Sequence, residues 1–289
     1  MKDFFHILNP SGSRKKQVRR FFGKNTELDF MWVERVSHPT HLETLVQWAV
    51  NEGRPRIAVW GGDGTLNRVA QCLYDLNAFG KMAVALVPVG TCNDFARKWG
   101  LPPWEKWVKQ GMTRGGGEPR PIDVGMLSTR RGHRVFINNS GFGRAPRAIG
   151  RRSHPLRDIF SFTEKRLDLD WSLDGARHFE TRRALLGIVF NAPYFNGGMY
   201  FDKSIEPDDN VLSAFFESPQ SAGRLLWKFL QSRFGKSLAD KNTFELKGQS
   251  FRIESDGDLF PQVDGETAFT GAVRSLEFSL LQDKMSLLL

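Results

Sequence analysis

The sequence predicts two domains of different class: an N-terminal α/β domain with a Rossmann-like parallel sheet, and a C-terminal domain that is mainly an antiparallel β-sandwich. Up to about residue 122, apolar β-branched runs alternate with helical periodicity, which predicts the first domain. The second is indicated by the short strand-like segments that follow, separated by turn residues. The residues alone leave open whether this second sheet closes into a barrel.

Strands and helices are expected to take turns in the N-terminal half. In order, we expect strands at 4–8 and 30–36, a helix in HLETLVQWAVNEG, a strand in RIAVWGG, a helix in TLNRVAQCLYDL, a strand in MAVALVPVG, and helices in NDFARKWG and WEKWVKQGMTR. Parallel strands end at one edge of their sheet, where such sheets bind ligands. The loops NPSGS, GGDGT and PVGTCND should therefore gather at that edge.

The C-terminal half is expected to be rich in strands, with helices near 157–166 and 221–234. Asp174-Gly175 predicts a tight hairpin turn. The expected strands lie in IDVGML, RVFINNSG, LDLDWSLDGARHFE, RALLGIVFNA, VLSAFFE, NTFELKG, FRIESDGD and VRSLEFSLL.

The chain is basic, with 41 Lys and Arg against 32 Asp and Glu and a formal charge of +9. This charge favours contact with phosphates, nucleic acid or an anionic membrane surface. No helix-turn-helix, zinc-finger or RNP signature is present, so we expect no nucleic-acid partner. Two cysteines and the lack of a long apolar run predict a cytoplasmic protein, at most peripheral at the inner membrane face.

The stretch VWGGDGTLNRVA surrounds one carboxylate, that of Asp63, with bare backbone at the point where a strand passes into a helix. Glycines there let N–H groups and the helix N-terminus approach a phosphate. Asp63 would repel a phosphate directly, so its functional role would be to hold Mg²⁺ that bridges phosphate oxygens. The alternative is a tight turn in which Asp63 caps the helix that begins near Thr65.

A second loop of the same kind, PVGTCNDFAR, follows the next strand. Gly90 gives backbone access, Thr91 offers a hydroxyl, and Asn93 or Asp94 can cap the following helix. Two such loops on neighbouring strands predict a nucleotide cradle.

The ordered set NPSGS, GGDGTLN, PVGTCNDFAR, DVG, PDDNVL and VDGE resembles the diacylglycerol kinase catalytic-domain family, and within it the bacterial soluble lipid kinases. The resemblance implies an NAD kinase/diacylglycerol kinase-like fold that uses ATP and Mg²⁺ to phosphorylate a lipid hydroxyl, such as that of diacylglycerol, phosphatidylglycerol or a sphingoid lipid. It also implies that the terminal KMSLLL returns to the first domain. The expected domains are thus 1–122 with 282–289, and 123–281.

Carried over residue by residue, the family's nucleotide-contacting positions match residues in four segments. Ser37 stands where relatives carry a threonine, and it has an N-cap as its alternative role. The implied nucleotide-binding residues are Asn9, Ser37, Gly61, Gly62, Asp63, Gly64, Thr65, Leu66, Asn67 and Thr91.

The aspartate of the family's DGE motif matches Asp264, with Glu266 two residues on. By resemblance Asp264 is the general base that accepts the proton of the lipid hydroxyl, with Glu266 and Asp63 as the other catalytic candidates. The alternative for VDGE is an ordinary Asp-Gly hairpin turn.

The stretch PDDNVLSA resembles the family's structural Mg²⁺ site, which maps to Asp209 and the carbonyls of Leu212 and Ala214. Asp209 as a plain turn residue is the alternative. Asn210 replaces the family's glycine, and because Asn tolerates positive φ we expect the turn to persist. Cys92 replaces a small residue in the second loop.

Two other functions stay open: an NAD kinase-like enzyme, which shares GGDGT, and a non-catalytic regulator that binds nucleotide or lipid. The arginine-rich stretch 143–158 would face anionic lipid or would be a solvated surface. The sequence leaves oligomeric state open, with a homodimer as one alternative.

Overall fold

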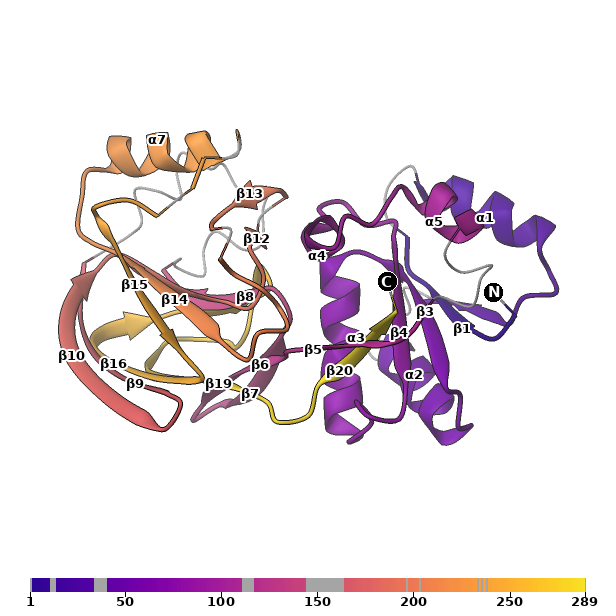
Figure 1. The fold of residues 1–289 in the computed structure, drawn as a ribbon, viewed down its shortest axis with the longest axis horizontal. Helices are drawn as coiled ribbons and strands as arrows, with labels where there is room; N and C mark the ends of the chain where they lie inside the picture. The colour runs from indigo at the N-terminus through magenta and orange to yellow at the C-terminus, as the bar shows by residue number, and fades with distance from the viewer. Residues whose placement is uncertain are drawn as a thin grey trace. The chain divides into compact units, whose positions relative to one another are not determined.

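The computed structural model describes residues 2–10, 14–33, 41–110, 117–143, 164–195, 197–202, 204–232, 234, 236–237 and 239–288. The chain divides into two compact units (Figure 1). Unit 1 comprises Met1–Ile122 and Asp283–Leu289, and unit 2 comprises Asp123–Gln282.

Unit 1 is a six-stranded, mostly parallel sheet in the order β2-β1-β3-β4-β20-β5. β5 is its antiparallel edge strand. The strands are β1 (Phe5–Leu8), β2 (Phe30–Trp32), β3 (Arg56–Gly61), β4 (Ala83–Pro88), β5 (Arg120–Ile122) and β20 (Met285–Leu288). The helices are α1 (Arg14–Lys24), α2 (His41–Asn51), α3 (Asp63–Asp75), α4 (Asp94–Lys98) and α5 (Trp104–Gln110).

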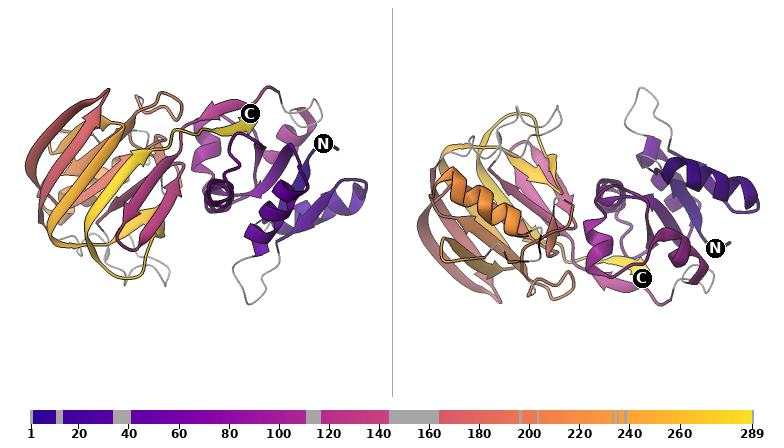
Figure 2. Two further views of the ribbon diagram at one scale, coloured as in Figure 1. Left: turned by 90° about the horizontal axis from the view of Figure 1, so that it is seen from below. Right: turned by 90° about the horizontal axis from the view of Figure 1, so that it is seen from above.

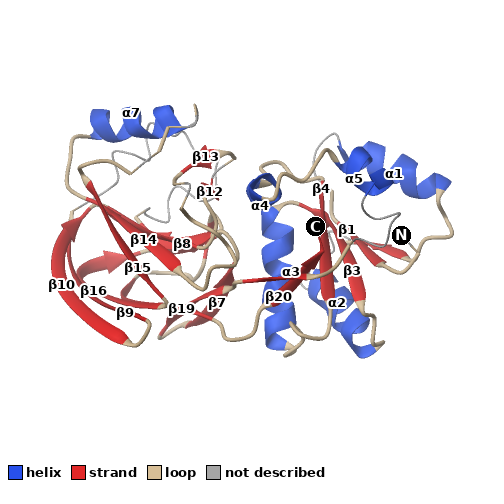
Figure 3. Cartoon of the chain, in the orientation of Figure 1, coloured by secondary structure: helices blue, strands red, loops and turns tan. Residues whose placement is uncertain are grey.

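Helices cover this sheet, as the alternating sequence pattern predicts (Figure 3). β4 is buried along its whole length, because its side chains alternate between two covered faces. Trp60 packs with aromatic side chains of α1 and α5, and α2 contacts α3 and β1. The sheet therefore holds the ends of β1, β3 and β4 rigidly at one edge.

Unit 2 consists of two six-stranded sheets, in the orders β10-β9-β16-β19-β6-β7 and β15-β14-β11-β8-β17-β18. Neighbouring strands in both sheets are antiparallel. The first sheet holds β6 (Gly125–Thr129), β7 (Gly132–Phe136), β9 (Lys165–Leu173), β10 (Ala176–Ala184), β16 (Ser250–Leu259) and β19 (Val273–Leu280). The second holds β8 (Asn139–Phe142), β11 (Leu186–Phe190), β14 (Leu212–Glu217), β15 (Thr243–Gly248), β17 (Pro261–Val263) and β18 (Glu266–Thr267).

One apolar core joins the two sheets, with Phe136 and Phe278 from one sheet against Phe142 and Phe216 from the other. This arrangement is the predicted sandwich, and the left view of Figure 2 shows the strands of the first sheet side by side. The short hairpin β12 (Tyr194–Phe195) and β13 (Met199–Tyr200) and the helix α7 (Ala222–Ser232) complete the described part of the unit.

Three local expectations can be compared with the structure. Asp174 and Gly175 turn β9 into β10 with φ of 48° and 81°, and α7 lies within the predicted 221–234 helix, so both are confirmed. The helix expected near 157–166 is wrong at its end, because Lys165 already lies in β9; residues 157–163 are outside the described residues.

Where residues are described, no helix is both long and apolar enough to cross a membrane.

Candidate functional site

Three loops meet at the carboxyl edge of the unit 1 sheet, where β1, β3 and β4 end side by side. Asn9, just after β1, donates its side-chain N–H to Thr65 Oγ1 at 3.1 Å. The N–H groups of Val89 and Gly90 both donate to the Gly61 carbonyl at 3.1 Å. The loops predicted to gather here are therefore joined to each other by hydrogen bonds.

Close packing requires glycine at two positions, Gly90 where the two loops touch and Gly61 where its own loop turns into α3. A Cβ on Gly90 would lie 2.2 Å from Gly62 Cα, and a Cβ on Gly61 would lie 2.5 Å from Thr65 Cβ. Neither position has room for a side chain, because the opposing atoms are backbone or the base of a buried residue. The two glycine-rich loops thus pack closely, and together with the first loop they form one platform.

Gly90→Ala should destabilise unit 1 by about 1–3 kcal/mol, since the added methyl must push the two loops apart. Gly80→Ala is the matched control, because a Cβ there meets nothing within 4 Å. Urea denaturation of both variants measures the difference. Equal stability of the two variants would contradict the described loop packing.

The N-terminus of α3 opens onto this platform. The helix starts at Asp63, and no side chain caps it at Gly62. The N–H groups of Thr65 and Leu66 donate to the Gly62 carbonyl, both at 3.0 Å. Leu66 is fully buried, so its side chain belongs to the core, whereas Gly62, Asp63, Gly64 and Asn67 are half-buried. An uncapped helix N-terminus attracts anions.

The Asp63 carboxylate caps α4, the helix of the second loop. Its oxygens accept the N–H groups of Asp94 and Phe95, each at 2.9 Å. The sequence left two roles open for Asp63, that of a metal ligand and that of a cap on its own helix. The observed cap lies on the neighbouring helix, 31 residues away in the sequence, and it ties GGDGT to PVGTCND.

Asn93 holds the turn of the second loop in a left-handed conformation, with φ of 54°. Its side-chain amide accepts the Gly90 N–H and donates to the Gly90 carbonyl, at 3.1 and 3.0 Å. Asn93 occupies the N-cap position of α4 without a side-chain cap, and Asp94 is already the first residue of the helix. The Asp63 carboxylate therefore supplies the cap that was expected from Asn93 or Asp94. Thr91 and Cys92 are exposed at the tip of this loop.

Arg14, the first residue of α1, brings a cation to the same edge. Its guanidinium donates to the Gly90 carbonyl. Sequence reasoning missed Arg14, although the basic run SRKKQVRR directly after the first loop was a visible signal. Ser37 lies outside the described residues. A positive charge beside an uncapped helix N-terminus favours an anionic ligand.

Asp264 occupies the first central position of a two-residue hairpin between β17 and β18. Asp264 and Gly265 have φ of 45° and 85°, so VDGE is the Asp-Gly turn that one alternative predicted. Its carboxylate nevertheless differs from that of an ordinary turn residue, because it accepts the N–H groups of Ile137, Asn138 and Asn139 at 2.9–3.0 Å. Glu266 is exposed.

These three N–H groups explain a difference from the expected strand in RVFINNSG. The strand is broken into β7 and β8 by a bend at residues 137–138. At the bend, consecutive N–H groups leave the ladder and point to Asp264. Fully buried Asn191 clamps the bend by donating to the carbonyls of Ile137 and Asp123, both at 2.9 Å.

The PDDN turn is anchored to buried Asp123. Asp123 accepts the Asn210 N–H at 2.7 Å, and Asn210 has φ of 63°, so the turn persists as expected. Burial raises the pKa of Asp209, and the nearby carboxylates of Asp123 and Asp208 add to the rise despite the N–H of Val211. The turn therefore concentrates negative charge.

The carbonyls assigned to a metal lie within a sheet. Ser218, just after β14, donates its N–H to the carbonyl of Asn242, just before β15. Every second residue of a strand directs its N–H and C=O groups to the same neighbouring strand. The Leu212 and Ala214 carbonyls therefore face β15, so only their second lone pairs remain for a cation. In the part of the chain that is described, no three His, Cys, Asp or Glu side chains gather as metal ligands. The donors left for the Mg²⁺ that the resemblance implies are thus the Asp209 carboxylate and these second lone pairs.

Comparison with known proteins gives a family match. Residues 3–127 match the diacylglycerol kinase catalytic domain. The chain is 24% identical to YtlR of Bacillus subtilis over 95% of this chain and 96% of that protein. It is 34% identical to diacylglycerol kinase of the same organism, over 48% of this chain and 45% of that protein.

The fold is also shared with a solved structure, that of a diacylglycerol kinase from Bacillus anthracis. The TM-score is 0.71 at 21% identity, over 99% of this chain and 96% of the other. The family match of residues 3–127 runs from β1 into β6 and includes the three joined loops. Residues 3–127 of this chain are therefore similar to the diacylglycerol kinase catalytic domain.

Proposed function

We propose that this protein is an ATP-dependent lipid kinase that transfers a γ-phosphoryl group to the hydroxyl of a lipid such as diacylglycerol, phosphatidylglycerol or a sphingoid lipid. The observation that carries the proposal is the platform of three hydrogen-bonded loops at the sheet edge, within the segment that matches the family. The alignment with the diacylglycerol kinase of Bacillus subtilis spans about half of either chain, so the activity of the whole protein is part of the proposal.

The platform would hold the ATP phosphates through its backbone. The α3 N-terminus and the Arg14 guanidinium supply positive potential, and exposed Thr91 supplies a hydroxyl. Asp63 would act by fixing the second loop rather than by touching phosphate, since both its oxygens accept N–H groups of α4. Asn9 would position Thr65 through their hydrogen bond.

Asp264 would accept the proton of the lipid hydroxyl as that oxygen attacks the γ-phosphorus and the bond to ADP breaks. The cradle of three N–H groups orients its carboxylate without supplying a competing base. Magnesium, when bound with ATP, would neutralise charge on the phosphates. The assignment of a resident Mg²⁺ to Asp209, Leu212 and Ala214 stays a prediction, and the catalytic role of Glu266 does too.

The test is transfer of labelled γ-phosphate from ATP, with Mg²⁺, to diacylglycerol, phosphatidylglycerol, a sphingoid base, ceramide or NAD in mixed micelles. Asp63→Ala should lose transfer, because α4 loses its cap. Asp75→Ala, an exposed residue at the other end of the same helix, should keep it. Label on a lipid supports the proposal; label on NAD, or ATP binding without transfer, contradicts it.

A further inference from the structure

α7 and the turn after it carry an exposed apolar stripe. Trp227, Leu230 and Phe234 are 62%, 45% and 86% exposed. They are spaced three and four residues apart and so share one helix face, and the Phe234 N–H continues the turn by donating to the Gln231 carbonyl at 3.0 Å. Among the described residues, the other large exposed apolar side chains are Met31 and Phe179, on separate strands. A grouped apolar surface of this kind indicates a binding face.

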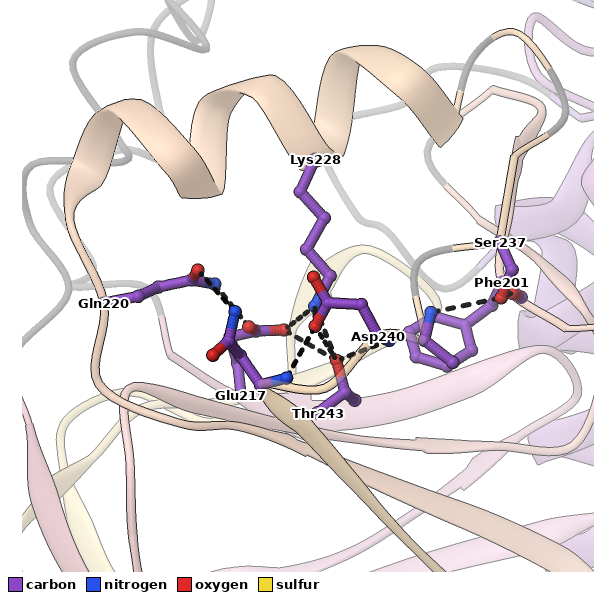
Figure 4. A network of polar contacts seen from close by, with 9 residues as sticks. Phe201, Glu217, Gln220, Lys228, Ser237, Asp240 and Thr243 are labelled. Atoms are coloured by element: carbon purple, nitrogen blue, oxygen red, sulfur yellow. Dashed lines mark hydrogen bonds and ion pairs between the residues drawn. The ribbon is translucent and has the colours of Figure 1, made fainter.

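Buried Lys228 fixes which face of α7 points outward. Figure 4 shows its side chain reaching from the helix toward the sheet. Its ammonium group donates to Glu217 at 2.6 Å, Asp240 at 3.0 Å and Thr243 at 2.5 Å. Because rotating α7 to bury Trp227 would pull Lys228 from these partners, the outward face is held in place.

The segment that carries the stripe contains charges of one sign. Between Glu217 and Asp240 the sequence contains four Lys and Arg residues and no Asp or Glu. The two flanking carboxylates are themselves paired with Lys228. Arg224 and Lys236, which are exposed, therefore leave the stripe bordered by positive charge.

We infer that α7 docks the protein on an anionic lipid bilayer. The 11-residue helix is about 16 Å long, so it would lie in the plane of the surface. Trp227, Leu230 and Phe234 enter the boundary between head groups and acyl chains, where aromatic side chains are favoured. Arg224 and Lys236 contact lipid phosphates. This assignment deepens the proposed function, on which it rests, because it names the surface that reaches a membrane-embedded acceptor.

The test is sedimentation of the full-length protein with vesicles of phosphatidylglycerol and phosphatidylcholine, without ATP. Trp227→Ser combined with Phe234→Ser should weaken binding about tenfold or more, since two exposed anchors are lost. Phe179→Ser is the matched control, because this 70% exposed side chain lies on β10 of the same unit, and it should leave binding unchanged. Equal binding by the double variant and the natural protein would overturn the inference.

Two further measurements separate the remaining explanations. Arg224→Ala with Lys236→Ala should reduce binding to vesicles that contain phosphatidylglycerol and not to pure phosphatidylcholine; no such difference would count against charge recognition. Sedimentation velocity identifies a second copy as the occupant, and a dimer that the Trp227 and Phe234 changes dissociate would overturn membrane docking. Vesicle binding needs no turnover, so its loss in the double variant would support docking even if every acceptor failed the kinase assay.

Discussion

Asp264→Asn should lower kcat about 10²- to 10⁴-fold, the range expected when a general base is removed. The amide keeps one oxygen for the N–H groups of Asn138 and Asn139, but it cannot accept the proton of the lipid hydroxyl. Its NH₂ group replaces the oxygen that accepts the Ile137 N–H, so that donor loses its acceptor. The measurement is single-turnover phosphoryl transfer at saturating ATP and lipid.

Asp174→Asn is the matched control for this change. Asp174 starts an Asp-Gly turn of the same shape, with φ of 48° beside 45° for Asp264, and it connects β9 to the edge strand β10 in the other sheet of the same unit. It should keep kcat near that of the natural protein. Near-normal transfer by Asp264→Asn, with chemistry shown to limit the rate, would remove Asp264 as the base.

Lys228→Met should destabilise the packing of α7 by about 3–5 kcal/mol, because it leaves the Glu217 carboxylate buried without its cation. Burial already raises the pKa of Glu217, with Lys228 opposing the rise. Without Lys228 to oppose it, the pKa of Glu217 in the folded state lies above its value in the unfolded chain. The protonated carboxyl is then tolerated at low pH, and the folded state loses stability as pH rises through the folded-state pKa. The deficit should thus be smaller at pH 5 than at pH 8.

The measurements are urea denaturation and hydrogen exchange of α7 at both pH values. Combining Lys228→Met with Glu217→Gln is the control, since the double change removes both charges and should recover a large part of the loss. A single variant with unchanged exchange in α7, or with a deficit that grows toward low pH, would contradict the described ion pair.

Local pattern was sufficient to predict the alternating strands and helices of unit 1, the strand-rich unit 2, and the gathering of the three glycine-containing loops. The first two depend on periodicity and turn residues within short segments, and the gathering follows because parallel strands end at one edge of their sheet. The partner of Asp63 was not predictable in this way, because its cap on α4 is a contact between two loops.

The same reason explains the bend in RVFINNSG. The alternation of the segment predicts one strand, but the carboxylate of Asp264, about 125 residues further along, draws three N–H groups out of the ladder. Helical periodicity likewise predicts α7, but it does not predict which face of the helix points to solvent. A lysine is expected to face solvent and a tryptophan the core; here the two acids that reverse this order come from segments on either side of the helix.

The position of β20 has a consequence for how the protein folds during synthesis. β20 lies between β4 and β5 in the unit 1 sheet, so residues 285–288 complete a domain that starts at the N-terminus. While unit 2 emerges from the ribosome, β4 has an open edge that is able to pair with other chains. Early folding of unit 2 would shorten the time for which the edge of β4 is exposed, because it brings β20 closer to the unit 1 sheet.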